Sequence, residues 1–555
     1  VILFIALSFN AVGQKGANNW YFGFKAGLDF KTDPPTILLD GQLSTEEGCA
    51  VVSNDEGELL FYTDGSTVWD AAHTVMPNGT GLKGNSSSAQ SAVILPKPGS
   101  TTEYYIFNSD FPSGGQGIHY SIIDMSQNSG LGDVTIKNTV LATGTYFESV
   151  GIASSATDGA YWVIVHKLTS DEFEAYEVTT LGVGAKVTSA VGASLVGSNI
   201  GYIKVDPCNR KVAMTQYTFA NIIQVLDFDN STGKLSNPYT INNQPICYGI
   251  EFSPNSRFLY SSGLNNNHIY QYDLDAANIK GSQVDIGTGN HSETGALQNG
   301  PDGKIYFAQT NGNAGFVGDG KITYMGVIEK PDILGTGATF NNKGPKFTSG
   351  GNMNYRGLPT FSSEYTSNVV RISHSDVCTD PVSFSYTYTG DAASQTWDFG
   401  DGSPTDTRAN PTHSYVPGTY TVEITVVDAK CGTKTVKETF TIPDQNATID
   451  FSYLNNDNYC NTDFTLAFSG GIASVTWDFD DTNSSTEQNP SHQYLTAGTY
   501  NVTVTVVDDV CGNTFTETNP VTVGPSGLVD PNIEYCSGIP VTLTLADGKN
   551  YCWST

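Results

Sequence analysis

The stretch WDFGDG, residues 397–402, decides the C-terminal part of the fold because it returns 80 residues later as WDFDDT, residues 477–482. Further positions repeat at the same offset: Gly418 with Gly498, Tyr420 with Tyr500, and Cys431 with Cys511. A constant offset over four kinds of residue indicates two copies of one structural unit.

Each copy contains a long segment in which apolar and polar residues alternate. These segments are YTVEITVVD (420–428) and YNVTVTVVD (500–508). Alternation with period two places one face of a strand inward and the other in water. Residues 370–445 and 447–524 are therefore predicted to be two β-sandwiches.

The letters D-F-G at 398–400 match the magnesium-binding tripeptide of protein kinases. A kinase also needs a lysine-bearing strand, an H-R-D loop and a helical lobe, and none of these is present in the sequence. Trp397 and Phe399 fall on one strand face, and Asp401-Gly402 is typical of a turn. We therefore expect Trp397 to anchor a core and Asp398 to accept hydrogen bonds from turn amides.

Residues 18–362 carry a different repeat, a polar turn followed by a short apolar strand. Its copies are SNDEGELLFYTDG (53–65), PKPGSTTEYYIFNSD (96–110), SSATDGAYWVIVHK (154–167), VDPCNRKVAMTQY (205–217), FSPNSRFLYSSG (252–263) and QNGPDGKIYFAQT (298–310). Their turn residues are Gly57, Gly99, Gly159, Asn209, Asn255 and Gly303. A period of about 40–50 residues with several strands is typical of a β-propeller.

Extrapolation of the repeat predicts seven blades, with a seventh copy at 350–361. The opening NNWYFGFKAGLDF (18–30) also alternates. We expect it to complete the last blade and so remove the free sheet edges of the ring.

Both regions resemble known families. The sandwiches resemble PKD domains, an immunoglobulin-like family, through WDFGDG, NPTHSY (410–415) and GTYTVEITVVD (418–428). The matching motif residues are Trp397, Asp398, Gly400, Asp401, Gly402, Trp477 and Asp478. The second copy departs at Asp480 and Thr482, where the first has glycines. The propeller repeats resemble WD40-like propellers, notably in SPNSRFLY (253–260).

Composition limits the classes of partner. The chain of 555 residues carries a net charge of −30, and charged residues make up only 15%. Such a surface repels nucleic acid and anionic lipid. The fold class predicted is all-β, an N-terminal β-propeller followed by tandem Ig-like PKD sandwiches.

The first 14 residues, VILFIALSFNAVGQ, indicate a secretory signal peptide without its basic start. No other run is long enough for a membrane span. Residues 530–555 are predicted to begin a third sandwich, because Cys536 precedes Trp553 by the same 17 residues that separate Cys460 from Trp477.

Nine cysteines in an exported chain favour disulfides. Each sandwich has one cysteine before its tryptophan and one after its last long strand, so we expect Cys378 to pair with Cys431, and Cys460 with Cys511. The alternative is buried free thiols. The pairing of the other cysteines is left open: Cys49, Cys208, Cys247, Cys536 and Cys552.

The sequence predicts no catalytic residue and no cofactor. The best candidate for a ligand is Ca²⁺ at an acidic turn of the second sandwich, with oxygen ligands from Asp478, Asp480, Asp481, Asn483 and Glu487. The spacing does not follow the EF-hand pattern, so a solvated acidic turn is the competing interpretation.

The whole arrangement resembles large cell-surface proteins of gliding Bacteroidetes, through NNWYFG, EGCAVVSNDEGELLFYTDG (47–65) and GLPTF (357–361). That resemblance implies type IX secretion and attachment at the outer surface of a Gram-negative cell. The hypothesis is a non-catalytic adhesin-type protein, with the mouth of the propeller channel binding an extracellular glycan or protein. The alternative is a secreted enzyme that degrades polysaccharide or protein.

Overall fold

The computed structural model describes residues 15–109, 117–157, 159–194, 200–217, 221–242, 247–264, 266–310, 323–347, 355–366, 370–388, 390, 392–443, 447–455, 461–496, 498–509 and 511–523. The chain divides into two compact units, and each is described by itself. The first, here the propeller unit, contains residues 1–371, 387–395 and 425–436. The second, the sandwich unit, contains residues 372–386, 396–424 and 437–555.

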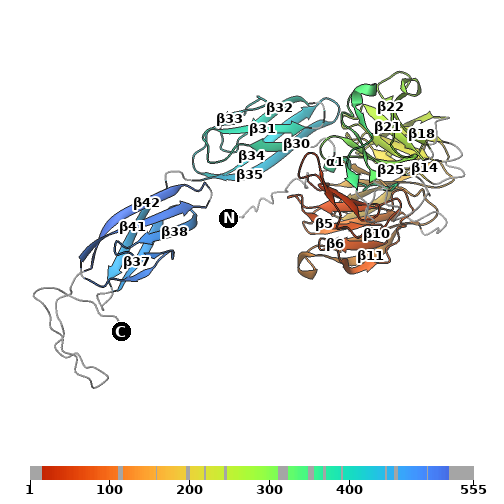
Figure 1. The fold of residues 1–555 in the computed structure, drawn as a ribbon. Coiled ribbons are helices and arrows are strands. Elements are labelled where there is room, and N and C mark those ends of the chain that lie inside the picture. The colour runs from red at the N-terminus through yellow and green to blue at the C-terminus, as the bar shows by residue number, and fades with distance from the viewer. Residues whose placement is uncertain are drawn as a thin grey trace, which may run out of the picture. The chain divides into compact units, whose positions relative to one another are not determined.

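Within the described residues of the propeller unit, six four-stranded antiparallel sheets follow one another along the chain (Figure 1). The first sheet comprises β4 (Ala50–Ser53), β5 (Leu59–Thr63), β6 (Thr67–Asp70) and β7 (Val75–Thr80). The second comprises β8 (Ala92–Pro96), β9 (Glu103–Ser109), β10 (Ile118–Asp124) and β11 (Asp133–Ala142). The third comprises β12 (Gly151–Ser154), β13 (Tyr161–His166), β14 (Glu172–Thr179) and β15 (Gly182–Ala190). The fourth comprises β16 (Ile203–Val205), β17 (Lys211–Gln216), β18 (Ile222–Asp229) and β19 (Lys234–Ile241). The fifth comprises β20 (Ile250–Phe252), β21 (Phe258–Gly263), β22 (Asn266–Asp273) and β23 (Val284–Thr288). The sixth comprises β24 (Glu293–Asn299), β25 (Ile305–Thr310), β27 (Gly326–Ile328) and β28 (Phe340–Asn341). Consecutive strands joined by hairpins in successive small sheets are the architecture of a β-propeller.

The six repeated turns of the sequence are the hairpins that join the first and second strands of these six sheets. A tight hairpin needs a residue with positive φ, which glycine supplies without steric cost. Gly57 has a φ of 85° and Gly303 a φ of 77°. In the fifth sheet the left-handed residue is Ser256, with a φ of 60°, whereas Asn255 uses its side-chain oxygen to accept the Ser253 hydroxyl and the Arg257 amide.

Both ends of the propeller region close the ring. The opening segment forms its own three-stranded sheet, β1 (Asn19–Phe22), β2 (Ala26–Asp29) and β3 (Thr36–Leu38). This sheet contacts the first four-stranded sheet where Tyr21 stacks on Tyr62 at 4.7 Å, and the sixth where Trp20 meets Tyr306 at 5.5 Å. With it, the ring contains seven sheets among the described residues.

The predicted seventh repeat does not form a hairpin of the same kind. Its residues 348–354 lie outside the described residues. The rest is an extended segment held by backbone hydrogen bonds. The Arg356 carbonyl accepts the Ala296 amide of β24, and the Arg356 amide donates to the Glu46 carbonyl. The Thr360 amide donates to the Cys49 carbonyl. The segment therefore ties the sixth sheet to the entry of the first.

Smaller elements complete the propeller unit. They are the 3-10 turns η2 (Asn128–Gly130), η3 (Lys280–Ser282) and η4 (Gly335–Ala338), the ladder of β26 (Thr323–Tyr324) with β29 (Lys346–Phe347), and α1 (Ser363–Thr366), the one α-helix among the described residues.

The C-terminal part contains two sandwiches, each built from two antiparallel sheets (Figure 1). The first has β30 (Val370–His374), β31 (Val382–Tyr388) and β33 (Thr412–His413) against β32 (Ala392–Asp398), β34 (Gly418–Asp428) and β35 (Gly432–Ile442). The second has β36 (Ile449–Asn455), β37 (Asn461–Phe468) and β40 (Ser491–Gln493) against β38 (Ile472–Asp478), β39 (Ser484–Ser485), β41 (Gly498–Asp508) and β42 (Thr514–Val523). Trp397 and Trp477 are fully buried in the two cores, as the alternation predicted.

The motif turn keeps its backbone shape in the second sandwich although it lacks glycine. Gly400 and Gly402 have φ angles of 75° and 80°, and their counterparts Asp480 and Thr482 have 60° and 75°. A β-branched residue such as threonine is poorly suited to this left-handed region.

Replacing Thr482 with glycine should therefore stabilise the second sandwich by about 0.5–1 kcal/mol, since the relieved backbone strain exceeds the entropy that glycine adds to the unfolded chain. The matched control is Gly402→Thr in the first sandwich. No atom lies within 4 Å of a Cβ added there, so its expected loss of about 1 kcal/mol is a backbone effect alone. Hydrogen exchange of the strands beside each turn measures both changes, and equal stability of Thr and Gly at position 482 would contradict the strain.

Candidate functional site

A buried cluster of polar side chains bridges the first strands of neighbouring propeller sheets. Neighbouring sheets contact each other through their first strands, β12 with β16, β16 with β20, and β20 with β24. There Lys204 of β16 donates to Glu251 of β20 at 2.9 Å and to Gln298 of β24 at 2.5 Å. All three side chains are buried.

Other bonds link first strands that are not neighbours. The Gln90 side chain, just before β8, accepts the Ile203 amide of β16 at 2.9 Å and donates to Thr360. The cavity beside this cluster measures about 20 Å³, which is room for about one water molecule. Long polar side chains therefore leave no room for a ligand at this cluster. The predicted site at the mouth of the channel, lined by the blade loops, stays a prediction.

A larger cleft lies between the second and third four-stranded sheets. Its volume is about 450 Å³, within the range of ligand sites. Three tyrosines, one lysine, one threonine and six small or apolar residues line it: Tyr120, Val140, Leu141, Ala142, Thr143, Tyr146, Tyr176, Val183, Gly184, Ala185 and Lys186. We call this the tyrosine cleft.

Its floor is organised by the carboxylate of Glu174 on β14, whose side chain is 1% exposed. Glu174 accepts the Tyr146 hydroxyl at 2.8 Å, the Tyr176 hydroxyl at 2.7 Å and the Lys186 ammonium at 2.6 Å. A buried carboxylate with three donors is satisfied and fixes the groups around it. Both tyrosine rings are thus held in place before any ligand arrives.

Electrostatics keeps these groups in one protonation state. Burial alone would raise the pKa of the Glu174 carboxyl, but the bonds from Lys186, Tyr176 and Tyr146 outweigh it and lower the pKa. Burial, together with the bond to Glu174, raises the pKa of Tyr146 and of Tyr176. Near pH 7 both tyrosines consequently stay protonated and uncharged. The Glu174 carboxylate is ionised, and the Lys186 ammonium balances its charge.

No motif in the sequence predicted this cleft. Tyr120, Tyr146 and Tyr176 lie in three different segments. Only the packing of β10 and β11 beside β14 and β15 brings them to one cavity. The one local signal is the Glu174-x-Tyr176 spacing, which places both side chains on one face of a strand.

The motif residues of the sandwiches have structural roles. Asp398 accepts the Gly400 amide at 2.9 Å, as the sequence predicted. Asp401 accepts the Ser403 amide at 3.0 Å and contacts His413 Nε2 at 2.8 Å. Burial opposes ionisation of Asp401, but the bonds from Ser403 and His413 prevail and lower its pKa to about 2.

The calcium candidates are engaged in the equivalent turn. Asp478 accepts the Asp480 amide, Asp480 the Asn501 amide, and Asp481 the Asn483 amide. The backbone oxygen of Glu487 accepts the Trp477 indole. Among the described residues, no group of three or more His, Cys, Asp or Glu side chains is placed to hold a metal ion. The carboxylates of the acidic turn accept backbone amides, and calcium binding there stays a prediction.

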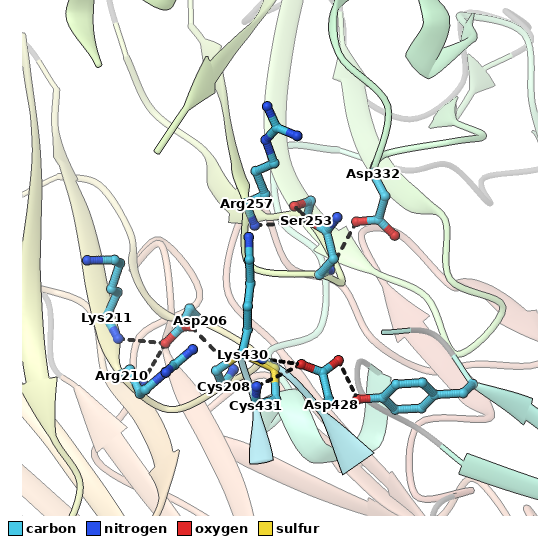
Figure 2. Close-up of a disulfide and its surroundings, with 12 residues drawn as sticks. Asp206, Cys208, Arg210, Lys211, Ser253, Arg257, Asp332, Asp428, Lys430 and Cys431 are labelled. Carbon is cyan, nitrogen blue, oxygen red and sulfur yellow. Dashed lines mark hydrogen bonds between the residues drawn. A yellow bond between two sulfur atoms is a disulfide. The ribbon is translucent and has the colours of Figure 1, made fainter. Parts of the chain in front are cut away.

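The predicted cysteine pairs are wrong. The structure joins Cys208 to Cys431 and Cys378 to Cys511, and Figure 2 shows the first of these bonds. Cys431 and Cys511 lie at the tips of the β34–β35 and β41–β42 hairpins, where each meets a cysteine outside its own sandwich. Cys460 lies outside the described residues, as do Cys536 and Cys552, whereas Cys49 and Cys247 are buried thiols.

Comparisons with known proteins agree with the sandwich assignment. Residues 368–443 and 446–523 match the PKD domain family, so the C-terminal part carries two PKD domains. Collagenase ColA of Bacillus cereus is 39% identical over 83 residues, which cover 14% of this chain and 8% of the collagenase. The chain thus spans only a small fraction of that relative's length.

Solved propellers are similar at low identity. The β-propeller domain of Cps50 (Swd1) from Myceliophteria thermophila has a TM-score of 0.34 at 11% identity, over 54% of this chain and 94% of that one. A protein of Bacteroides fragilis provisionally assigned as a 6-phosphogluconolactonase has a TM-score of 0.40 at 12% identity, over 61% and 97%. Both scores are low, so the propeller assignment rests on the sheet topology of this chain. In the described part of the chain, no helix has the length and apolar character to cross a membrane.

Proposed function

We propose that the chain is an extracellular, non-catalytic binding protein of the adhesin type, whose propeller binds a glycan in the tyrosine cleft. The observation that carries the proposal is the cavity of about 450 Å³ lined by three tyrosines, two of which, Tyr146 and Tyr176, are fixed by hydrogen bonds to Glu174. Tyrosine rings offer flat apolar faces with a polar edge, which suits the alternating C–H and hydroxyl surfaces of a sugar.

The disulfides and the PKD domains support a location outside the cytosol, where disulfides persist. In this proposal the two PKD domains are spacers, and the surface belongs to a Gram-negative cell that exports the chain by type IX secretion, as the resemblance in the opening sequence implies.

The alternative function, a secreted degradative enzyme, is not favoured by the cleft. Glycoside hydrolysis needs two carboxyl groups that face the substrate. None of the eleven residues that line the tyrosine cleft is acidic, and Glu174 beneath them already has three donors.

A glycan array probed with the full chain tests the proposal. Tyr120→Ala should weaken binding of any retained glycan roughly tenfold or more, because it removes one ring face from the cleft. Tyr176→Phe keeps its ring and loses only the bond to Glu174, so its effect should be smaller. Tyr270, also partly exposed and also on the third strand of its sheet, supplies the control Tyr270→Ala.

Glycan binding that survives Tyr120→Ala and falls with Tyr270→Ala would place the site elsewhere. Binding of proteins but of no glycan would refute the ligand class. Thermal unfolding of each variant excludes loss of fold as the cause.

A further inference from the structure

The four cysteines that form disulfides in the described part of the chain all lie in turns capped by an aspartate. The Cys208 amide donates to Asp206 at 3.3 Å and the Cys378 amide to Asp376 at 2.9 Å. The Cys431 amide donates to Asp428 at 2.8 Å and the Cys511 amide to Asp508 at 2.6 Å. An aspartate that accepts amides ahead of it fixes the local backbone and so the direction of the following side chain.

These turns are of two kinds. Cys208 and Cys378 stand two residues after the aspartate, in a pattern Asp-x-Cys. Cys431 and Cys511 stand three residues after it, in a pattern Asp-x-x-Cys at a hairpin tip. Each disulfide joins one turn of the first kind to one of the second.

The propeller turn is held by hydrogen bonds that do not involve the disulfide. Asp206 is buried and also accepts the Arg210 and Lys211 amides, both at 2.6 Å (Figure 2). It thereby organises the whole β16–β17 hairpin turn that carries Cys208.

The hairpin tip is equally organised. Asp428 accepts the Lys430 amide at 2.7 Å and the Tyr388 hydroxyl at 3.0 Å (Figure 2). Lys430, which belongs to the same compact unit as Asp275, places its ammonium 3.0 Å from that carboxylate. This ion pair gives the tip a charged contact with the turn after β22, in addition to the sulfur bond.

We propose that the Asp-x-Cys turn is a docking site whose partner is the Asp-x-x-Cys hairpin tip of a PKD domain, and that oxidation then locks the docked tip. The same pairing occurs on two unrelated hosts, a propeller hairpin at Cys208 and a sandwich loop at Cys378. The shared element is the capped turn, which indicates that the turn and not the surrounding domain is recognised.

The locking step is an ordinary oxidation. The two thiols together lose two protons and two electrons as the sulfur–sulfur bond forms. A disulfide-bearing oxidant, in the cell an exported thiol–disulfide oxidoreductase, takes them up as two thiols. Recognition by the turns comes first and places the sulfurs side by side, which raises their effective concentration.

Two variants of the full chain serve as controls for each other. The folded, reduced chain is oxidised with glutathione disulfide, trapped with N-ethylmaleimide at intervals and mapped by mass spectrometry of unreduced peptides. Asp428→Ala should slow formation of Cys208–Cys431 about tenfold, the equivalent of about 1.4 kcal/mol of lost preorganisation, and leave Cys378–Cys511 unchanged. Asp508→Ala should do the reverse.

The bond that each variant leaves untouched reports that the chain is still folded. Lys430→Glu, which opposes Asp275, should slow only Cys208–Cys431. Equal rates in all variants would overturn recognition by the turns, as would equal slowing of both bonds. A peptide map with Cys378–Cys431 in the wild-type chain would overturn the pairing itself.

Discussion

Replacing Lys204 by alanine is expected to destabilise the propeller by about 3–5 kcal/mol, because it leaves the buried Glu251 carboxylate without its cation. The Lys204 ammonium lies 2.9 Å from Glu251, and their side chains are 8% and 5% exposed. It also donates to Gln298, so its removal leaves two acceptors on neighbouring first strands without their donor.

The effect is measured by native-state hydrogen exchange of the β16, β20 and β24 peptides. Exchange resolved by peptide separates the propeller from the PKD domains, which a single unfolding curve does not. A loss below about 1 kcal/mol would show that the cluster is hydrated and behaves as a surface pair.

The double variant Lys204→Met with Glu251→Gln is the informative control. In the wild type, Glu251 accepts the backbone amides of Phe252 and Asn299. The double variant removes both charges, and the glutamine keeps one side-chain oxygen that can accept one of these two amides. Neutral replacement of a buried ion pair costs far less than removal of one partner. We therefore expect the double variant to recover about half of the stability that Lys204→Ala loses.

Local turn chemistry made much of the fold predictable. Each four-stranded sheet begins with a hairpin whose turn residues are close in sequence, so the six repeats identify their hairpins directly. Closure of the ring depends on contacts such as Trp20 with Phe361. These residues are far apart in the chain, and no local sequence pattern predicts their contact.

The cysteines show where spacing stops being informative. Cys431 and Cys511 repeat at the same offset as the tryptophans, so a bond inside each repeat and a bond to the preceding domain satisfy the spacing equally. The aspartates at 428 and 508 were visible in the sequence, but their role depends on which turn lies opposite. That information is tertiary, and it determines the pairing.

The tyrosine cleft was missed for the same reason. Its residues come from two neighbouring sheets, and each alone is an ordinary partly or fully buried tyrosine. The mouth of the channel was predicted as the site from the general form of propellers. Within the channel, the side chains of Gln90, Lys204 and Gln298, each ordinary in sequence, bridge segments of different sheets.

Acid should destabilise the propeller through His166, the last residue of β13. Its ring is fully buried and meets Phe173 edge-on at 4.3 Å. Burial lowers the pKa of His166 to about 4, although the charge of Asp171 opposes the shift. Between about pH 6.5 and pH 4 the unfolded chain therefore binds a proton that the folded chain refuses, and stability falls as the pH falls.

Glu47, three residues before β4, has the opposite effect on the pH dependence of stability. Burial raises the pKa of its carboxyl to about 7, while Arg356 and Tyr248 work against that rise. Between about pH 4.5 and pH 7 the folded chain holds a proton that the unfolded chain has released, so stability rises as the pH falls. The two residues oppose each other over nearly the same window, and the wild-type stability alone reveals neither.

Differences between variants and wild type separate them, since all other titrating groups cancel. From pH 7 to pH 4, His166→Leu should gain about 3 kcal/mol relative to wild type, the equivalent of the difference between a pKa of about 4 and the ordinary 6.5. His166→Gln should follow the same slope if the loss of a titrating ring, and not the change in polarity, is the cause. Over the same range Glu47→Gln should lose a comparable amount.

Hydrogen exchange of β13 and β4 peptides, corrected for the pH dependence of intrinsic exchange, measures each slope. Parallel pH profiles for wild type and both histidine variants would mean that the His166 ring has access to water in the folded state.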